Sequence, residues 1–356
     1  MKFTFLSKFL ITTCFALIFT APLIADDEHE KEAYKNREGS IVVANRASES
    51  LSVINVRSDQ VIKTIQLPAA TNPAQPMYVV HTPRSDRIFV GDRSNNRVLV
   101  LDDEDYSIEA SVPAGNGVFH MWADPSASQL WVNNDIDKTM TVIDPVTLQV
   151  LATVAIPADL ASLGGKPHDV ILDPSGRAAF VSIVGLSGSN DVIVRFDTEN
   201  FIETARAEVG LDSHVSLTRH NKLLYVPCQN TNNVYVLKRK DLSLVKILDV
   251  PAAHGAGMPR HGRTFYTTNI SGGGSNAIYA INTRRNTVRE TAVDTPYAVP
   301  HNLALTNNSK KLYVTHSGAS SDKVSVFRIN RKTQLAEYVT EVTVGLNPFG
   351  LTYVEE

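Results

Sequence analysis

The sequence predicts an all-β fold, a seven-bladed β-propeller built from four-stranded sheets. The prediction depends on a recurring hairpin pattern, on the lack of a convincing helical period, and on a C-terminal segment that has the pattern of a first strand but no second strand after it. The clearest hairpin is 300–314 (PHNLALTNNSKKLYV), where two apolar runs flank a polar turn. Such a repeat decides the fold, because each unit buries its apolar face only against its neighbours.

The hairpin pattern recurs along the chain and defines the blades. Further copies lie at 118–132 and 167–181, and looser ones at 76–90 and 213–226. Third strands such as VIVRF (192–196) and KVSVF (323–327) follow, and their alternation is typical of sheets that pack on both faces. The predicted blades, of which the sixth is the most degenerate, are 41–67, 76–112, 118–156, 167–209, 213–250, 254–293 and 300–344.

The first blade has only three predicted strands, at 41–43, 51–56 and 61–67. Its missing innermost strand is supplied by 348–354 (PFGLTYV), which matches the first strand of the hairpin pattern. Pairing the C-terminal strand into the N-terminal blade closes the ring and removes exposed sheet edges. The propeller domain is therefore predicted to span residues 40–356.

The N-terminus resembles a secretory signal. Lys2 and Lys8 precede an apolar stretch at 9–20 that is too short to span a membrane, and cleavage is expected after Ala25. An uncleaved N-terminal anchor is the alternative. Residues 26–39 form a charged linker. We expect a periplasmic or secreted protein whose mature chain has no membrane span.

Composition excludes several function classes. The net charge of -3 argues against nucleic acid or an anionic membrane as partner. Cys14 lies in the leader, so Cys228 is the sole cysteine of the mature chain, which excludes an internal disulfide. The chain has no CxxCH, GxSxG, HExxH or phosphate-loop motif, which excludes covalent c-type haem and the common hydrolase signatures.

The ends of the second strands carry a family resemblance. They read LWVNN (130–134), LYVPC (224–228) and LYVTH (312–316). Together with the hairpin, this pattern resembles the YVTN-type seven-bladed propellers, including the YncE-like periplasmic proteins, over residues 40–354. The resemblance implies the fold and leaves function open, because the repeat encodes packing and turns.

Histidines recur where each chain segment enters the innermost strand. Alignment of the blades places five histidines on consecutive blades, with Tyr78 and Gly350 at the same register of blades 2 and 1. Only 10 of 356 residues are histidine, so the recurrence is far outside chance. We expect these side chains to form an arc at one rim of the central channel. The arc consists of His120, His168, His214, His254 and His301.

Imidazoles on neighbouring blades are suited to hold a transition-metal ion, with copper favoured and zinc or iron as alternatives. His316 and Cys228 end second strands on the same rim and are further candidate ligands, although a lone cysteine is more often a small buried apolar residue. The alternative for the arc is structural, with each imidazole bonded to a neighbouring blade's backbone.

The arc is similar in kind to the copper sites of nitrous oxide reductase, thiocyanate dehydrogenase and the methanethiol oxidases of the selenium-binding-protein family, which are propeller enzymes. This resemblance covers architecture and ligand type, and their substrates do not transfer. It implies a copper-dependent oxidoreductase acting on a small molecule, with Tyr78 assisting by hydrogen bonding. Arg46, Asp92 and Arg93 on nearby loops are candidates to orient an anionic or polar ligand, or are solvated loop residues.

Two other functions stay open at this point. One is a non-catalytic binding module of the cell envelope, whose partner is an envelope protein or ligand. The other is a lactonase or lyase that uses a divalent ion and a histidine base. Few carboxylates lie near the arc, Asp92 and Asp169 being the candidates, which speaks against a site for a hard cation.

Overall fold

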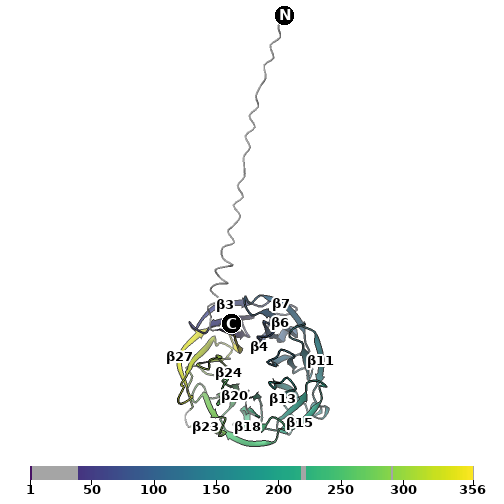
Figure 1. Cartoon of the computed structure of the whole chain (residues 1–356), viewed down its shortest axis with the longest axis vertical. Coiled ribbons are helices and arrows are strands. Elements are labelled where there is room, and N and C mark those ends of the chain that lie inside the picture. The colour runs from purple at the N-terminus through teal and green to yellow at the C-terminus, as the bar shows by residue number, and fades with distance from the viewer. Residues whose placement is uncertain (2–38, 218–221, 290–291, 356) are drawn as a thin grey trace. The chain divides into compact units, whose positions relative to one another are not determined.

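The computed structural model describes residues 1, 39–217, 222–289 and 292–355, and its strands form seven four-stranded antiparallel sheets. The sheets surround a common centre (Figure 1). This confirms the predicted all-β propeller of seven blades. The predicted leader (1–25) and charged linker (26–39) lie outside the described residues, apart from Met1 and Gly39.

Each blade has an innermost strand near the axis, followed outward by a second strand. The inner strands, from blade 1 to blade 7, are β28 (Pro348–Val354), β4 (Pro76–Thr82), β8 (Val118–Ala123), β12 (Lys166–Leu172), β16 (Ser216–Leu217), β20 (Ala253–Gly257) and β24 (Pro300–Leu305). The second strands are β1 (Ser40–Asn45), β5 (Arg87–Asp92), β9 (Leu130–Asn134), β13 (Ala178–Val184), β17 (Leu223–Cys228), β21 (Thr264–Asn269) and β25 (Lys311–His316).

The third and fourth strands complete each blade toward the periphery, where Figure 1 labels β3, β7, β11, β15, β23 and β27. The third strands are β2 (Ser50–Asn55), β6 (Arg97–Asp102), β10 (Thr139–Ile143), β14 (Val192–Asp197), β18 (Asn233–Lys238), β22 (Ile278–Asn282) and β26 (Lys323–Ile329). The outer strands are β3 (Gln60–Gln66), β7 (Ile108–Pro113), β11 (Val150–Ala155), β15 (Glu203–Glu208), β19 (Leu244–Asp249), β23 (Thr287–Val288) and β27 (Ala336–Thr343).

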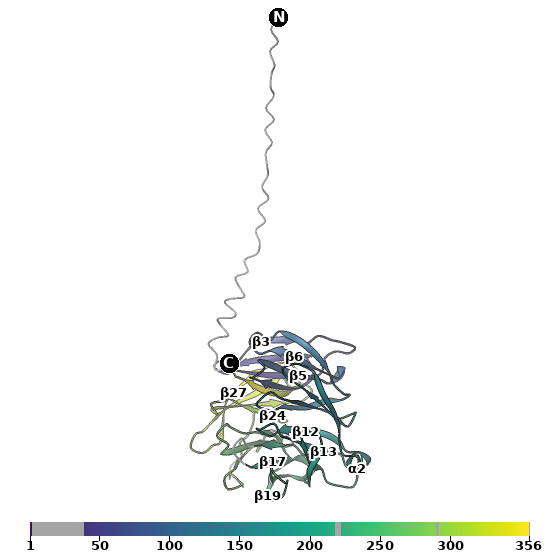
Figure 2. The same cartoon turned by 45° about the vertical axis from the view of Figure 1, so that its right-hand side comes forward.

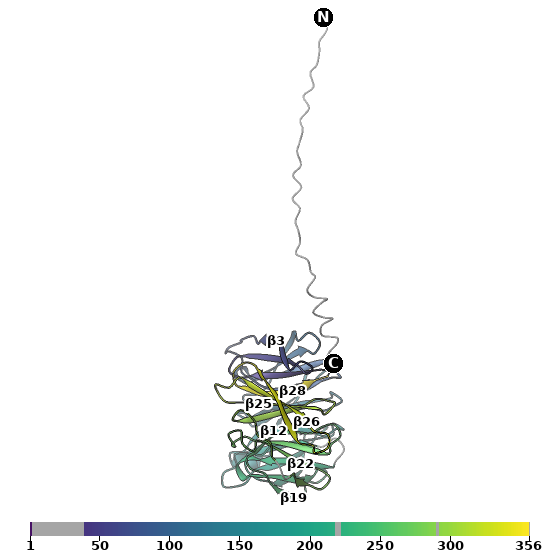
Figure 3. The ribbon, with the colours of Figure 1, turned by 90° about the vertical axis from the view of Figure 1, so that its left-hand side faces the viewer.

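The two ends of the propeller meet in blade 1, as predicted. β28 pairs antiparallel with β1, from Ser40 opposite Val354 to Asn45 opposite Pro348. Figure 3 shows the late strand β28 in the same region as the early strand β3 of that sheet. The ring is therefore closed by main-chain hydrogen bonds between residues far apart in sequence.

Apolar residues between blades form the core. Second strands such as β1 are buried along their whole length, whereas outer strands such as β15 alternate between partly buried and exposed residues. Trp131 of blade 3, for example, packs against Phe196 of blade 4 with ring centroids 5.9 Å apart. Burial on both sheet faces explains why the second and third strands are nearly continuous apolar runs.

The turns between third and outer strands use a repeated device. The Asp144 carboxylate accepts the backbone N–H groups of Val146 and Thr147, and Asn282 and Asn330 cap the corresponding turns of blades 6 and 7. These side chains stabilise a tight turn locally, which is why Asp or Asn ends the third-strand pattern.

The sequence predicted only strands and turns, but the structure also contains one helical turn. The helix α2 (Ala158–Ser162) lies beside β13 at the edge of the sheets (Figure 2), and the 3₁₀ turns η1 (Arg93–Asn95) and η2 (Gln229–Thr231) follow second strands. The helix falls in an insertion before blade 4 and is too short to show a helical period in the sequence. No helix in the described part of the chain is long and apolar enough to cross a membrane.

Candidate metal centre

A gap in strand pairing marks the point where each inner strand begins. In six blades the register slips by one residue across this gap, as between Pro300 and Leu303. Blade 5 keeps its register between the Ser213–Cys228 bridge and the Ser216–Tyr225 pair. β-bulges of this kind redirect side chains at the rims of closed sheets. Each blade therefore presents two residues near the axis between its paired positions, and in blade 5 the first of them, His214, still donates its backbone N–H to the Pro227 carbonyl oxygen.

We call these two residues the first-position and second-position residues. The first-position residues are Met77, Phe119, His168, His214, His254, His301 and Phe349. The second-position residues are Tyr78, His120, Asp169, Val215, Gly255, Asn302 and Gly350.

The prediction that five histidines share one register is wrong by one residue in blade 3. Four of them occupy the first position, whereas His120 occupies the second and Phe119 the first. In blade 1, Phe349 takes the first position. A Cβ on Gly350 would lie 2.5 Å from the Met77 carbonyl oxygen, so glycine permits the close approach of blade 2 there.

The predicted arc nevertheless forms, because the rings of these residues contact one another around the axis. Among first-position residues, centroid distances are 4.7 Å for His168–His214, 4.1 Å for His214–His254 and 4.6 Å for His254–His301. Phe349 continues the ring at 4.2 Å from His301. His120 lies against it, 5.2 Å from His168 and 5.3 Å from His214.

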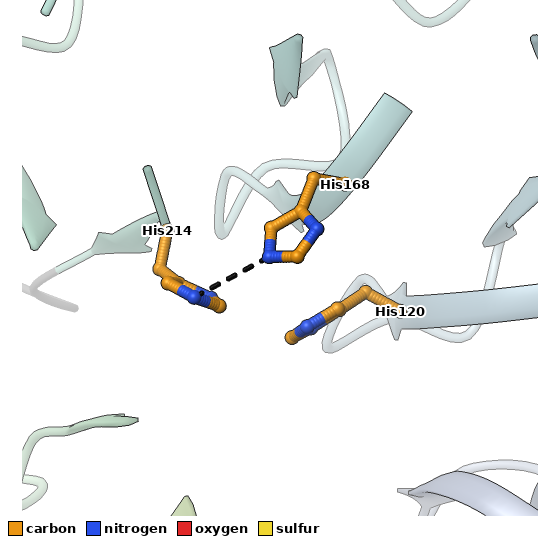
Figure 4. A group of neighbouring side chains, drawn as sticks. All are labelled: His120, His168 and His214. Atoms are coloured by element: carbon orange, nitrogen blue, oxygen red, sulfur yellow. Dashed lines mark hydrogen bonds between the residues drawn. The ribbon is translucent and has the colours of Figure 1, made fainter. Parts of the chain in front are cut away.

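Three of the histidines are arranged as metal ligands would be. One ring nitrogen from each of His120, His168 and His214 lies within 4.8 Å of the other two. Figure 4 shows the three rings pointing toward one another from separate blades, with the Nε2 atoms of His168 and His214 3.4 Å apart. The Nε2 atom of His120 is buried and has no hydrogen-bond partner. This nitrogen is therefore free to bind an ion or a water molecule.

Asp169 lies behind this triad and orients it. Its Oδ1 atom is 2.9 Å from His120 Nδ1, and its Oδ2 atom is 3.6 Å from His214 Nδ1. The same carboxylate accepts the backbone N–H groups of Val170 and Val215 at 2.8 and 2.9 Å. A carboxylate on Nδ1 favours the tautomer whose Nε2 is free to coordinate. The sequence pointed to Asp169 only as a nearby carboxylate.

Burial keeps the histidines neutral. Burial lowers the pKa of His120 even though Asp169 opposes the shift, and burial together with neighbouring imidazoles lowers the pKa of His168 and His254 well below the usual value. Burial alone would raise the pKa of Asp169, but His120 and His214 hold it well below its usual range. The site therefore combines the neutral imidazoles of His120 and His168 with an ionised Asp169 carboxylate, the protonation states that metal binding requires.

The remaining two arc histidines differ from the triad. Both ring nitrogens of His254 are buried without a hydrogen-bond partner. The Nδ1 atom of His301 lies 2.9 Å from Asn302 Nδ2, and the same amide group donates to the Phe349 carbonyl oxygen. Nδ1 of His301 is therefore the acceptor, which places the proton of the neutral ring on Nε2. His254 therefore has two ring nitrogens without a partner, whereas His301 accepts a hydrogen bond from Asn302 of its own blade.

The structure does not bring His316 into the arc. Its Nδ1 atom is 3.0 Å from the Ala298 carbonyl oxygen and its Nε2 atom 2.8 Å from Ser325 Oγ. Asn45 and Asn134 end their second strands in the same way and donate to third-strand hydroxyl groups. His316 thus replaces these asparagines in a structural contact, a role that its shared register with them could have indicated.

Tyr78 lies at the arc, and Arg46 and Arg93 lie over two aromatic rings of the first-position residues. Tyr78 is 3.7 Å from His120 between ring centroids, and its buried hydroxyl has no hydrogen-bond partner. Burial, reinforced by Asp169, raises its pKa well above the usual value, so the hydroxyl stays protonated. Arg46 lies over Phe349 and Arg93 over Phe119, at 5.2 and 5.6 Å from the ring centroids.

Asp92 and Cys228 have structural contacts. Asp92 is fully buried and pairs with Arg97 at 2.8 Å, so it takes no part in the arc. Cys228 is also fully buried, and burial raises the pKa of its thiol. It packs in the apolar cluster between blades 4 and 5, as the small apolar residue that the sequence favoured.

A cavity opens on the second-position side of the arc. It has a volume of about 220 Å³ and is lined at one end by Tyr78, His120, Asp169, His214 and His254. It provides room for a small molecule next to the triad.

Comparisons with known proteins identify the family to which this propeller is similar. A family model described as "Lactonase, 7-bladed beta-propeller" matches residues 28–253. Protein NirF of Stutzerimonas stutzeri is 34% identical over 79 residues, which are 22% of this chain and only 20% of that relative.

Solved structures share the fold. The periplasmic gluconolactonase PpgL of Pseudomonas aeruginosa has a TM-score of 0.72 at 16% identity, over 89% of this chain and 99% of that one. The dihydro-heme d1 dehydrogenase NirN, solved in complex with DHE, has a TM-score of 0.61 at 11% identity, over 88% and 75%. Kuenenia stuttgartiensis hydrazine synthase has a TM-score of 0.63 at 15% identity, over 77% and 88%. At these identities the likeness concerns the fold alone.

Proposed function

We propose, starting from the fact that this chain belongs to the lactonase family of seven-bladed β-propellers, that it binds a divalent transition-metal ion and hydrolyses a lactone-type ester. The histidine triad carries this proposal. Three imidazoles converge from separate blades, one with an orphaned buried nitrogen and two with a carboxylate behind them. A buried nitrogen without a protein partner calls for a ligand such as an ion or a water molecule.

The donor set fits a transition metal. Nitrogens about 2.1 Å from a shared ion lie at most ~4.2 Å apart, and the three nitrogens here lie within 4.8 Å. Small side-chain rotations therefore suffice for them to share an ion. Neutral imidazole suits zinc, copper, iron and nickel, whereas magnesium and calcium prefer oxygen. Three ligands leave an open position, as in catalytic rather than structural sites.

The residues around the triad have distinct roles in the proposed reaction. A bound divalent ion would act as a Lewis acid on the ester carbonyl. His120, His168 and His214 would hold the ion, and Asp169 would hold two of the rings in the required tautomer. His254 lines the same cavity with both ring nitrogens unpaired, so it is suited to orient the attacking water by a hydrogen bond, and the water's proton would pass to the alkoxide leaving group of the ester. Tyr78 would donate a hydrogen bond to a substrate oxygen.

A copper-dependent oxidoreductase is the second candidate. The observation in its favour is the number of neutral imidazoles, because His254 adds free nitrogens beyond the three of the triad. The triad's donor atoms are all nitrogen, which suits copper as well as zinc. The two candidates share the site and differ in metal and reaction.

We propose the periplasm as the compartment. The signal-like residues 1–25 support export, as does the fold shared with a protein named as a periplasmic gluconolactonase. The proposed partner is then a small-molecule substrate of that compartment. An envelope protein is the partner expected if the propeller is a binding module.

The test is metal content and lactone hydrolysis of protein purified mildly from its native compartment. We expect at least one equivalent of transition metal and ester cleavage that chelation removes and that zinc or copper restores. His168→Ala should lose both, whereas His316→Asn should keep both. Less than one equivalent of metal in the wild type would end the metal proposal and favour the non-catalytic binding module. Bound copper with substrate oxidation instead of hydrolysis would select the second candidate.

A further inference from the structure

The cavity beside the triad extends along the inner strands toward the opposite mouth of the propeller. A second cavity, of about 350 Å³, lies where the inner hairpins turn. The two cavities share four lining residues, Trp122, Ile171, Leu217 and Met258. The cavity beside His120 and His214 and the cavity at the far mouth therefore meet at these four side chains.

Several uncharged, apolar side chains line the middle of the bore. Beyond Asp169 and the histidines at its inner end, none of the residues lining the inner cavity carries a formal charge. Several blades contribute aliphatic or thioether side chains, including Met121, Leu217, Leu303 and Leu351.

The charged groups at the far mouth already have partners. His81 lies 2.7 Å from Asp103, and Asp124 accepts the backbone N–H groups of its own turn. Arg260 and Glu355 form an exposed ion pair at 2.7 Å, a kind of contact too weak to close the opening.

Trp122 marks the entrance. This side chain is 46% exposed, whereas the other tryptophan, Trp131, is fully buried. Proline residues of four inner turns stand around it and give the mouth a stiff backbone (Pro83, Pro125, Pro174 and Pro259). An accessible aromatic side chain at the mouth of a cavity is typical of a small-molecule site.

We infer that the bore binds the apolar chain of the ligand, so that the substrate is an ester or lactone carrying an acyl chain. The inference rests on the proposed function for the reacting group, because the triad would take the carbonyl end. The chain itself would lie along Leu351 and Leu217 and end at Trp122.

The test is a binding series with γ-lactones of four to twelve carbons on metal-free protein, measured by calorimetry and by Trp122 fluorescence. Burial of each added methylene should tighten binding about fourfold until the bore is filled. Trp122 emission should shift on binding, and Trp122→Phe should abolish the signal, because Trp131 is inaccessible. An affinity independent of chain length would overturn the inference.

A matched pair of variants locates the site. Leu351→Glu places a charge in the bore, whereas Leu151→Glu places one on the outer strand β11, where Leu151 is 46% exposed. We expect the first to remove the chain-length dependence and the second to leave it intact. If Leu351→Glu does not fold, by circular dichroism, Met258→Glu at the mouth serves instead. Unchanged binding in the folded bore variant would also overturn the inference.

The outcomes separate this inference from the proposed function. If long lactones bind in the bore but metal-loaded protein does not cleave them, the hydrolase proposal fails and the binding site stands. If lactones are cleaved at rates independent of chain length and none binds in the bore, the hydrolase proposal stands and the bore site fails.

Discussion

Replacing Asp169 with asparagine tests whether the triad is held ready for a metal. The carboxylate accepts from His120 Nδ1 at 2.9 Å and from the Val170 and Val215 N–H groups at 2.8 and 2.9 Å. The asparagine side chain would keep one acceptor oxygen and turn an NH₂ group toward another donor. At least one buried donor would therefore lose its partner.

The expected magnitudes follow from these contacts. Loss of a carboxylate behind a ligating histidine typically weakens metal binding 10- to 100-fold, which is about 1.4–2.7 kcal/mol. A buried donor left without an acceptor costs about 1–3 kcal/mol of unfolding free energy in the metal-free protein. Asp169→Asn should thus bind zinc 10- to 100-fold more weakly and unfold at lower urea concentration.

The assay is a competition titration of zinc against a chelator, combined with urea unfolding of the metal-free protein. Asp92→Asn is the control, because Asp92 is a fully buried carboxylate that pairs with Arg97 away from the arc. The control should lose stability and keep its zinc affinity within about twofold. If Asp169→Asn binds zinc as tightly as the wild type, the assignment of the triad as a metal site is refuted.

Three further predictions concern other parts of the molecule. His316→Asn restores the residue type of other blades and should leave metal content unchanged by elemental analysis; a loss of half the metal would contradict the structural assignment. Burial lowers the pKa of His301 to about 3, so folded His301 stays neutral while the unfolded chain takes up a proton below about pH 6.5. The stability that neutral His301 contributes is present above that pH and is lost as the pH falls, by up to about 1.4 kcal/mol of unfolding free energy per pH unit. In metal-free His301→Phe, the unfolding free energy measured with urea should therefore fall less steeply between pH 6.5 and 4. Equal slopes for the variant and the wild type would contradict this assignment. Deleting Pro348–Val354 exposes the edge of β1 and should abolish cooperative thermal unfolding; a truncated protein that melts like the full chain would argue against closure by this strand.

The fold could be predicted in detail because its signals are local. Alternating apolar runs, Asp or Asn at the turns and the PFGLTYV segment each report on their own stretch of chain, and a repeat multiplies such weak signals. The number of blades, the strand order and the closure by β28 are all confirmed. The missed element, α2, is a single helical turn.

The candidate site was only partly predictable. The recurrence of histidine near the start of the inner strands indicated that His168, His214, His254 and His301 would meet, and they do. Sequence alignment could not tell that His120 stands one residue later than these four. A bulge changes which residue faces the axis without changing the apolar pattern on either side.

By itself the sequence determined the propeller, its closure and the end of the bore where imidazoles gather, since these follow from patterns within single blades. Only the tertiary structure decided that three of the histidines form a triad, that Asp169 lies behind two of them and that His316 is bonded within its blade. It also placed aliphatic and thioether side chains along the bore beneath. These contacts join side chains from different blades, and their distances depend on how the closed ring brings the blades together.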